Sequence, residues 1–231
     1  MKNSSYRINE YIRQLPEGSI FEVSAVFREN FEGESEAAFY KTIERATKEK
    51  RLLHIGRGLY YKPKQGVFGI VPPQDEEVAQ YYMKDGHGIY VGYRLYNRKG
   101  ISTQISKTIE VLSDSLSGEQ KSVQNVKVKK INVALTPDTI PVIETLEILQ
   151  NYNRIENLNN RGLTEYIREF ASSYSDNAAH EVIQNRKYKK STVAFLKACL
   201  DYLKVPNTLG VYLSKLSVYA FPNVEDLYEA A

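Results

Sequence analysis

The side chains best suited to chemistry in this sequence are cationic and hydroxyl groups between positions 35 and 48. Lys41, Arg45 and Lys48 recur at spacings of four and three, which place them on one face of a helix. Their ammonium and guanidinium groups can donate to phosphates, and Lys41 and Arg45 also to guanine edges. Ser35, near the helix start, and Tyr40 can contact a phosphate, and Tyr40 can also pack on a thymine methyl. This set predicts an interface for a nucleic acid.

A further cation, Arg57, stands between Gly56 and Gly58. Glycine on both sides lets the backbone turn tightly, so the guanidinium at the tip can enter a minor groove or lie along phosphates. A structural hairpin turn with an incidental arginine is the alternative interpretation.

Formal charge changes sign within the same part of the chain. Residues 16–39 hold six Glu and one Arg, which give −5, whereas residues 40–64 hold eight Lys or Arg and two Glu, which give +6. The net charge of the whole chain, +3, decides nothing alone. The switch indicates a basic face directed at a polyanion, because neutralising phosphates supplies most non-specific affinity for nucleic acids. A solvated surface of mixed charge is the alternative.

The elements that must position these residues follow from hydrophobic periodicity. Phe39, Ile43 and Ala46 repeat at i, i+4 and i+7, as the buried face of a helix does. Two β-prone runs then flank the Gly-Arg-Gly turn, as in a hairpin. The predicted elements are helices over residues 4–15, 23–27 and 34–51, and strands over residues 52–55 and 59–61. Three helices and a hairpin in about 60 residues predict a winged helix-turn-helix, which we assign to residues 1–64.

The remainder of the chain predicts two further parts. Pro63 and Lys64-Gln65-Gly66 mark a boundary, after which residues 65–137 read as a small α/β domain. Its predicted elements are helices 75–83 and 93–97, strands 88–92, 108–112 and 126–135, and a turn over 113–124. The fold class predicted for the whole chain is therefore α+β.

Residues 138–231 predict a helical C-terminal region. We expect Asp176-Asn177 and Ser191 to cap two of its helices. The basic run at 184–190 predicts an exposed loop between helices, with contact to nucleic-acid phosphates as the alternative. The predicted helices of this region cover residues 141–151, 164–173, 178–184, 192–203 and 208–217.

Two separated segments resemble one known family. Gly56-Arg57-Gly58-Leu59-Tyr60, preceded by a helix and by Leu52-Leu53-His54-Ile55, resembles the wing of the N-terminal domain of AbiEi-type antitoxins. The segment Tyr96–Gln104 resembles the short helix, turn and Gly-Leu-Thr-Thr-Gln-like run of that family's next domain, with Ile101 and Ser102 in place of the commoner Leu and Thr. The resemblance covers about residues 1–137 and does not extend to the helical tail. It implies a repressor that binds inverted repeats in its own promoter and counteracts a nucleotidyltransferase-like toxin.

Several classes of protein are disfavoured by the sequence. His54, His87 and His180 lie far apart and form no metal-ligand spacing, so we expect no metal, no cofactor and no catalytic residues. Cys199, the only cysteine, falls in an apolar helical pattern and predicts a buried structural thiol. No apolar run approaches the roughly 20 residues that span a bilayer, and no signal-type segment begins the chain. We therefore expect a cytoplasmic protein without membrane contact.

The function expected from the sequence is a bacterial transcriptional repressor that binds double-stranded DNA at promoter inverted repeats. By the family resemblance it would act as the antitoxin of an abortive-infection operon, with a nucleotidyltransferase-like toxin as its partner. The competing interpretation is a protein-interaction module that holds a partner protein through its helical C-terminal region. An enzyme, the third class, would need an activity that nothing in the sequence predicts.

Overall fold

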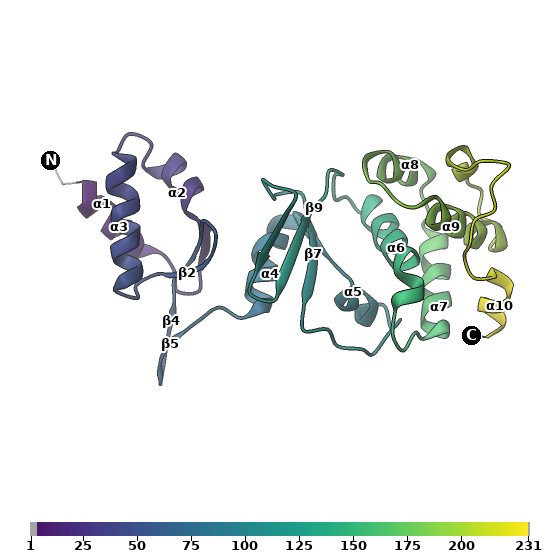
Figure 1. Cartoon of the computed structure of the whole chain (residues 1–231), viewed down its shortest axis with the longest axis horizontal. Helices are drawn as coiled ribbons and strands as arrows, with labels where there is room; N and C mark the ends of the chain where they lie inside the picture. Colours follow the sequence, from purple (N-terminus) through teal and green to yellow (C-terminus); the bar gives the residue numbers. More distant parts are fainter. Residues whose placement is uncertain (1–3, 231) are drawn as a thin grey trace. The chain divides into compact units, whose positions relative to one another are not determined.

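The protein has an α+β fold. A computed structural model describes residues 4–230, in which helices predominate over small sheets. The chain forms two compact units (Figure 1). The first contains the chain up to Tyr81 together with Ser122–Val126, and the second contains Tyr82–Lys121 and the chain from Lys127 onward. The domain boundaries after residues 64 and 137 remain predictions.

The first unit combines three helices with a three-stranded sheet. Strand β3 pairs antiparallel with both β1 and β2, which gives the order β1-β3-β2. The predicted helices and hairpin are all present, and β1 adds a strand at the short apolar passage after the first helix. The elements are α1 (Ser4–Gln14), β1 (Ile20–Glu22), α2 (Val23–Asn30), α3 (Glu36–Lys48), β2 (Leu53–Gly56) and β3 (Leu59–Tyr61).

The core of this unit fixes which face of α3 is turned to solvent. Phe39, Ile43 and Ala46 are buried, as their spacing predicts, and pack in one cluster with Ile8 and Ile12 of α1. Burying a side chain as large as phenylalanine stabilises the fold by roughly 1.5–3 kcal/mol. Because the apolar stripe of α3 is held in this way, its polar stripe faces outward.

Helix α3 is shorter at both ends than the predicted span of residues 34–51. It begins at Glu36 because the Ser35 side chain accepts a hydrogen bond from the Ala38 amide, which is the geometry of an N-cap. At the other end Lys50 adopts a φ of +57°, and the Arg51 amide donates back to the Ala46 carbonyl at 2.8 Å. This left-handed residue with its backward hydrogen bond ends the helix in a Schellman-type arrangement.

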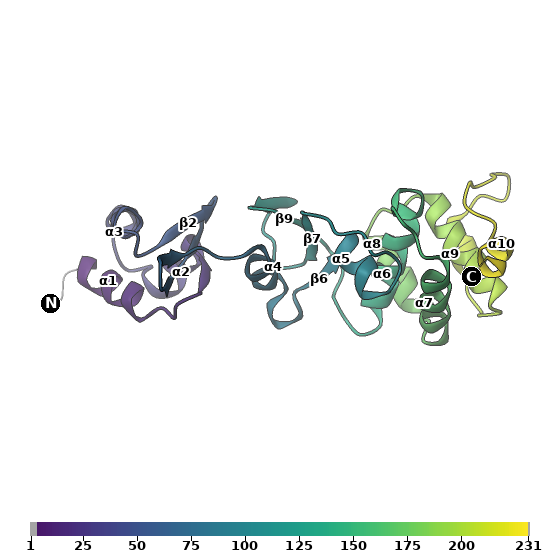
Figure 2. The same ribbon diagram turned by 90° about the horizontal axis from the view of Figure 1, so that it is seen from below.

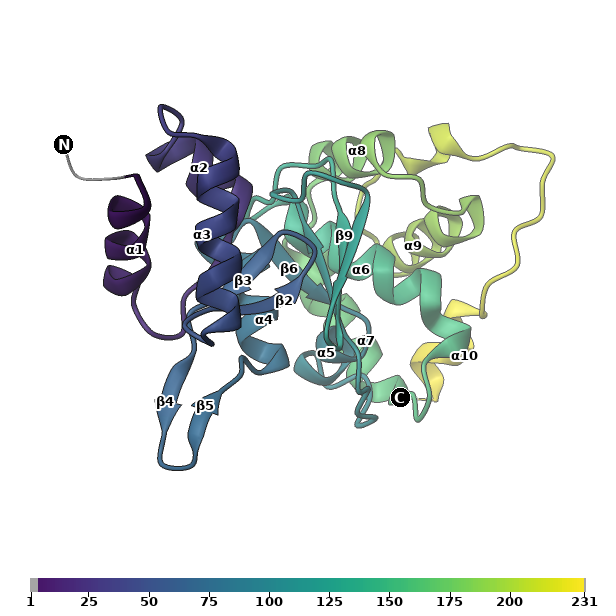
Figure 3. The same cartoon turned by 60° about the vertical axis from the view of Figure 1, so that its left-hand side comes forward.

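A second hairpin follows directly after β3. Strand β4 (Lys64–Gly66) pairs antiparallel with β5 (Gly69–Val71), and the two strands form a separate two-stranded sheet. Lys64-Gln65-Gly66, which the sequence indicated as a boundary segment, is thus a strand in the structure. In Figures 1 and 3 this hairpin projects away from α1, α2 and α3.

The second unit contains most of the helices and most of a four-stranded sheet, apart from the residues of β8 and β9 that fall within Ser122–Val126. The sheet has the order β6-β7-β9-β8, and β6 pairs antiparallel with β7. Helix α6 packs against both α7 and α9, as Figure 2 shows. After α4 (Asp75–Met83), whose last residues begin this unit, the elements are β6 (Gly88–Val91), α5 (Tyr93–Arg98), β7 (Ile109–Ser113), β8 (Gln120–Val123), β9 (Val126–Lys130), α6 (Thr139–Asn151), α7 (Asn160–Ser172), α8 (Asp176–Asn185), α9 (Lys190–Tyr202) and α10 (Val224–Glu229), with short 3-10 turns η1 (Lys84–Gly86), η2 (Tyr152–Arg154) and η3 (Leu209–Tyr212).

Several local predictions for this unit are wrong. The N-cap of α8 is Ser175, which accepts from the Ala178 amide, and not Asp176-Asn177. Helix α9 begins at Lys190, so Ser191 lies inside it. The predicted helix 208–217 is only the four-residue turn η3. Beyond that turn Leu213 is partly buried against the core, whereas Leu216 is fully exposed. Two elements were not predicted: β8, inside the presumed turn 113–124, and α10.

None of the helices formed by residues 4–230 combines the length and apolar character needed to cross a membrane.

Candidate nucleic-acid interface

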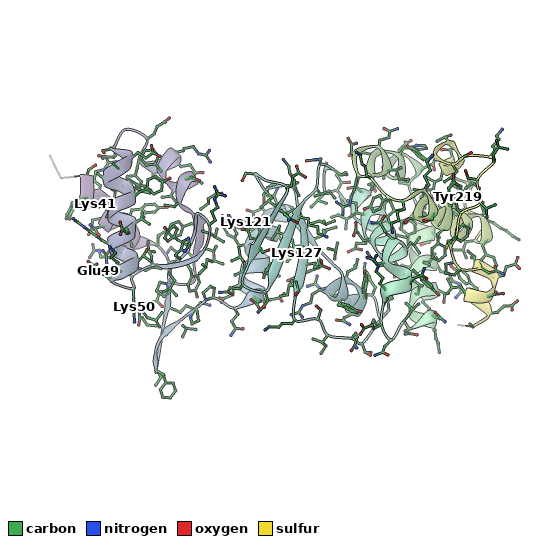
Figure 4. The ribbon with its side chains drawn as sticks, in the orientation of Figure 1. Lys41, Glu49, Lys50, Lys121, Lys127 and Tyr219 are labelled. Atoms are coloured by element: carbon green, nitrogen blue, oxygen red, sulfur yellow. The ribbon has the colours of Figure 1, made fainter. Side chains whose placement is uncertain are left out.

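The exposed face of α3 carries four of the six predicted contact residues. Tyr40, Lys41, Arg45 and Lys48 are all exposed, opposite the buried stripe of the helix. The structure therefore brings these four together on one surface, which we call the α3 face. Figure 4 shows Lys41 at the outer edge of the first unit.

The cations of the α3 face differ in whether a carboxylate neutralises them. Lys48 forms an ion pair with Glu44 at 2.7 Å, and this hydrogen-bonded contact holds the pKa of Glu44 below its ordinary value. Lys41 and Arg45 form no ion pair in the described part of the chain, although their charges also contribute to the lowered pKa of Glu44. With Glu36 and Glu44 against three cations, α3 carries a formal charge of only +1. The cationic character available to a ligand therefore rests on Lys41 and Arg45.

Tyr40 is held in place by aromatic neighbours. Its ring stacks on Phe27 of α2 with centroids 6.4 Å apart, and it meets the buried Phe39 edge to face at 5.5 Å. Such pairs contribute roughly 0.5–1.5 kcal/mol beyond the burial of their area. The exposed part of Tyr40 is therefore a fixed platform and not a freely rotating side chain.

Ser35 lies at the start of α3, as predicted, but part of its hydrogen-bonding capacity is already used. Its oxygen accepts from the Ala38 amide at 3.4 Å, which leaves the hydroxyl hydrogen able to donate. A helix N-terminus favours an anion, whereas the exposed carboxylate of Glu36 in the same first turn opposes one.

Arg57 forms the tip of the β2–β3 hairpin. Its side chain is exposed and forms no ion pair or hydrogen bond with any of residues 4–230. Only one of its two glycine neighbours takes up a left-handed conformation, Gly58 at a φ of +69°. Gly56 is instead the last residue of β2, next to an irregularity in the register with Leu59. The turn therefore depends on Gly58, and it presents Arg57 on the same unit as the α3 face.

The second segment that resembles the antitoxin family lines a pocket in the other unit. The pocket has a volume of about 390 Å³ and is lined by Arg94, Asn97, Ser102 and Thr103 among others. Much of its polarity is used internally. The Asn97 amide donates to the carbonyl oxygens of Ser102 and Gln104 at 2.6 and 3.0 Å. These contacts hold the turn after α5, so the segment has a structural role that its sequence did not reveal.

Two of the three histidines are hydrogen-bonded to other side chains of the protein. The described residues contain no group of three His, Cys, Asp or Glu arranged to hold a metal ion. His180 is hydrogen-bonded through its two ring nitrogens to the hydroxyl groups of Tyr212 and Thr208, each at 2.6 Å. His87 contacts Asp114 at 2.8 Å.

The protein is therefore of the α+β class, and the exposed face of its third helix, α3, carries two cations that form no ion pair. Comparison with known families shows to which family the protein belongs. Residues 7–145 match the model of DUF6088, a family of unknown function, and the chain belongs to that family. No curated protein matches the sequence. Among solved structures, the chain is similar to the crystal structure of the RV2827C protein from Mycobacterium tuberculosis, with 11% sequence identity and a TM-score of 0.44, over 86% of this chain and 76% of that one.

Proposed function

We propose that the first unit contains a winged helix-turn-helix that binds double-stranded DNA. The order of elements, α1-β1-α2-α3-β2-β3, and the sheet order β1-β3-β2 support this proposal. In such a domain α3 enters the major groove and the β2–β3 hairpin is the wing. The observation that carries the proposal is the unpaired state of Lys41 and Arg45 on a helix whose opposite face is fully buried.

Each predicted contact residue has a distinct role in this proposal. Lys41 and Arg45 donate to phosphates or guanine edges, and Tyr40 packs beside them. Arg57 follows the minor groove or the phosphates next to it. Lys48, already paired with Glu44, contributes less than the two unpaired cations.

The biological role that we propose is transcriptional repression of the protein's own operon, as the antitoxin of an abortive-infection system. The likeness of residues 56–60 and 96–104 to AbiEi-type antitoxins supports this role. It assigns promoter inverted repeats as the DNA and a nucleotidyltransferase-like toxin as the partner protein. The protein acts by binding and not by catalysis.

A mobility-shift assay with DNA from upstream of the operon tests the proposal. The wild-type protein shifts this DNA in the presence of excess unrelated competitor, and the double variant Arg45→Ala/Arg57→Ala does not. Lys48→Ala is the matched control, because it removes a cation of the same helix face that is already paired. A shift that ignores sequence, or one that survives the double substitution, would contradict the proposal.

A second candidate function is supported by a different surface. Leu216 and Val218, in the segment between η3 and α10, are fully exposed, and Val211 of η3 is largely so. Exposed apolar side chains of this kind suit a protein partner, so the helical region would be an interaction module. Pull-down of the neighbouring gene product from nuclease-treated lysate, lost on Leu216→Ser/Val218→Ser, favours this function if the first unit binds no DNA.

A further inference from the structure

The β4–β5 hairpin ends in two apolar side chains that touch nothing. Val67 and Phe68 form the two-residue turn between the paired glycines Gly66 and Gly69. Their exposed fractions, 96% and 103%, are those of free side chains in solvent. Exposing a complete phenylalanine at the tip of a protruding hairpin is unfavourable for solubility, so the residue needs an explanation.

The conformation of the turn does not explain why Val67 and Phe68 are apolar. Two-residue hairpin turns favour glycine, asparagine or aspartate, and β-branched or aromatic residues are poor choices there. The two glycines of this hairpin have clear conformational roles. Gly69 has a φ of +113°, and a Cβ atom on Gly66 would lie 2.8 Å from Cγ2 of Val71. No such requirement applies to Val67 or Phe68, neither of which has a positive φ. Their apolar character is therefore not demanded by the fold.

The charge of the hairpin restricts what it can contact. Residues 65–74 contain no charged side chain, so inserting the tip into another molecule would bury no charge. Lys64, at the base, is paired with Glu77, and the Gln65 amide donates to Glu17 at 3.4 Å. The base is thereby tied to the body of the unit, while the tip presents no carboxylate that phosphates would repel.

The size of the tip argues against a protein partner. One aromatic side chain buries about 150–250 Å². A stable protein interface buries about 800 Å² on each partner, which two side chains alone cannot supply. A single apolar wedge is sufficient, however, between two stacked base pairs. Minor-groove proteins insert one Phe, Leu or Ile at a base step and kink the duplex by roughly 20–90°.

We propose that Phe68 is an apolar wedge that enters the minor groove and unstacks one base step of the DNA held by the α3 face. This inference rests on the proposed DNA binding, since the hairpin and α3 belong to the same unit. Val67 packs against the sugar edge beside the wedge, and the uncharged residues 65–71 span the groove. The protein then bends its operator as well as reading it, and sequence steps that unstack easily are favoured at the point of insertion.

The test uses the full-length protein and duplexes from upstream of its operon, each with 2-aminopurine at one position across the bound site. The fluorescence of 2-aminopurine rises when the base is unstacked. We expect a several-fold rise at one position with the wild-type protein and none with Phe68→Ala, although Phe68→Ala still binds the duplex. Phe68→Leu restores part of the rise, and Val71→Ala, on the strand beside the tip, keeps it. End-to-end energy transfer across the duplex reports the bend. We expect the bend to be largest with the wild type and Val71→Ala, smaller with Phe68→Leu and absent with Phe68→Ala.

The outcomes separate this inference from the function on which it rests. If the wild-type protein binds no upstream DNA, the proposed function fails and the wedge with it. If it binds but no position brightens, or Phe68→Ala brightens the duplex as the wild type does, the wedge alone is wrong. A change in sedimentation of the free protein on Phe68→Ala would assign the tip to self-association and would also overturn the wedge.

Discussion

Lys48 forms an ion pair with Glu44 at 2.7 Å, whereas Lys41 and Arg45 on the same helix face form no ion pair with any residue of the described chain. The three cations look equivalent in the sequence, because they recur at helical spacing. They are not equivalent in the structure, since the carboxylate one turn before Lys48 neutralises it. This difference orders the expected effects of substitution.

The first prediction concerns that order. We expect Arg45→Ala to weaken binding to upstream DNA by about 1–3 kcal/mol, because one phosphate or groove contact is lost. The slope of the logarithm of the binding constant against the logarithm of the salt concentration should fall in magnitude by about one. Lys48→Ala should cost clearly less. Fluorescence anisotropy titrations at several salt concentrations measure both quantities. Equal losses for the two variants would show that the ion pair with Glu44 does not decide which cation is available.

The second prediction concerns the wing. Gly58 has a φ of +69°, and a Cβ atom there would meet no neighbour, so an added methyl group acts through backbone strain alone. We expect Gly58→Ala to lower the free energy of unfolding of the first unit by about 1 kcal/mol and to weaken DNA binding. Gly118→Ala is the matched control, because that glycine also has open space but no positive φ. Urea unfolding that leaves the two variants equally stable would contradict the assignment of strain.

The third prediction concerns the helical region of the second unit. Arg186 donates two hydrogen bonds to one carboxylate oxygen of Glu147, at 3.1 and 2.7 Å, and their side chains are only 21% and 11% exposed. Arg186→Ala leaves a mostly buried carboxylate without its partner, and we expect a loss of roughly 3 kcal/mol in the free energy of unfolding.

The control for this ion pair is an exposed one. Arg161 and Glu165 lie 2.9 Å apart, but their side chains are 73% and 59% exposed, so Arg161→Ala should cost less than about 1 kcal/mol. Chemical denaturation followed by circular dichroism compares the two variants. Similar losses for both would mean that burial does not set the strength of the Glu147–Arg186 pair.

The fourth prediction concerns the single cysteine. Burial raises the pKa of the Cys199 thiol to about 12 from an ordinary value of 9.0. The folded protein keeps the proton at a pH where the unfolded chain has lost it. Stability from this group is therefore complete below about pH 9 and falls as the pH rises towards 12.

Two measurements check the fourth prediction. Iodoacetamide should label Cys199 at pH 8 only after the protein is unfolded in urea, because the buried thiol is neither ionised nor accessible. Between about pH 9 and 10, before the buried tyrosines contribute a loss of their own, the alkaline loss of stability should be smaller in Cys199→Ala, which serves as the control. Rapid labelling of the native protein would contradict the burial of this thiol.

The sequence predicted those features that depend on local periodicity. The buried stripe of α3 was correct because Phe39, Ile43 and Ala46 follow the helical repeat without interruption. The ends of α3 were placed too far out, since its C-terminal end depends on the left-handed conformation of Lys50. A lysine gives little signal for that conformation, whereas glycine would have done so.

Long-range contacts explain most of what the sequence did not predict. The basic run at 184–190 was interpreted as an exposed loop, but Arg186 turns inward to Glu147, 39 positions earlier, and Tyr188 is only partly exposed. No local pattern announces such a partner. The β4–β5 hairpin was missed for another reason, since Gly66 was taken as a sign of a boundary and its partner Gly69 was not considered. Two glycines separated by two apolar residues were the available signal.

The measurement that tests the central claim most directly is the ratio of affinities for upstream operon DNA and for a scrambled duplex of the same composition. Competition titrations at physiological salt give this ratio for the wild type and for Arg45→Ala/Arg57→Ala. The account predicts a ratio on the order of 10³ or more for the wild type, and a large loss of affinity for the upstream duplex in the double variant. A wild-type ratio near one, or a double variant that binds as tightly as the wild type, would contradict it.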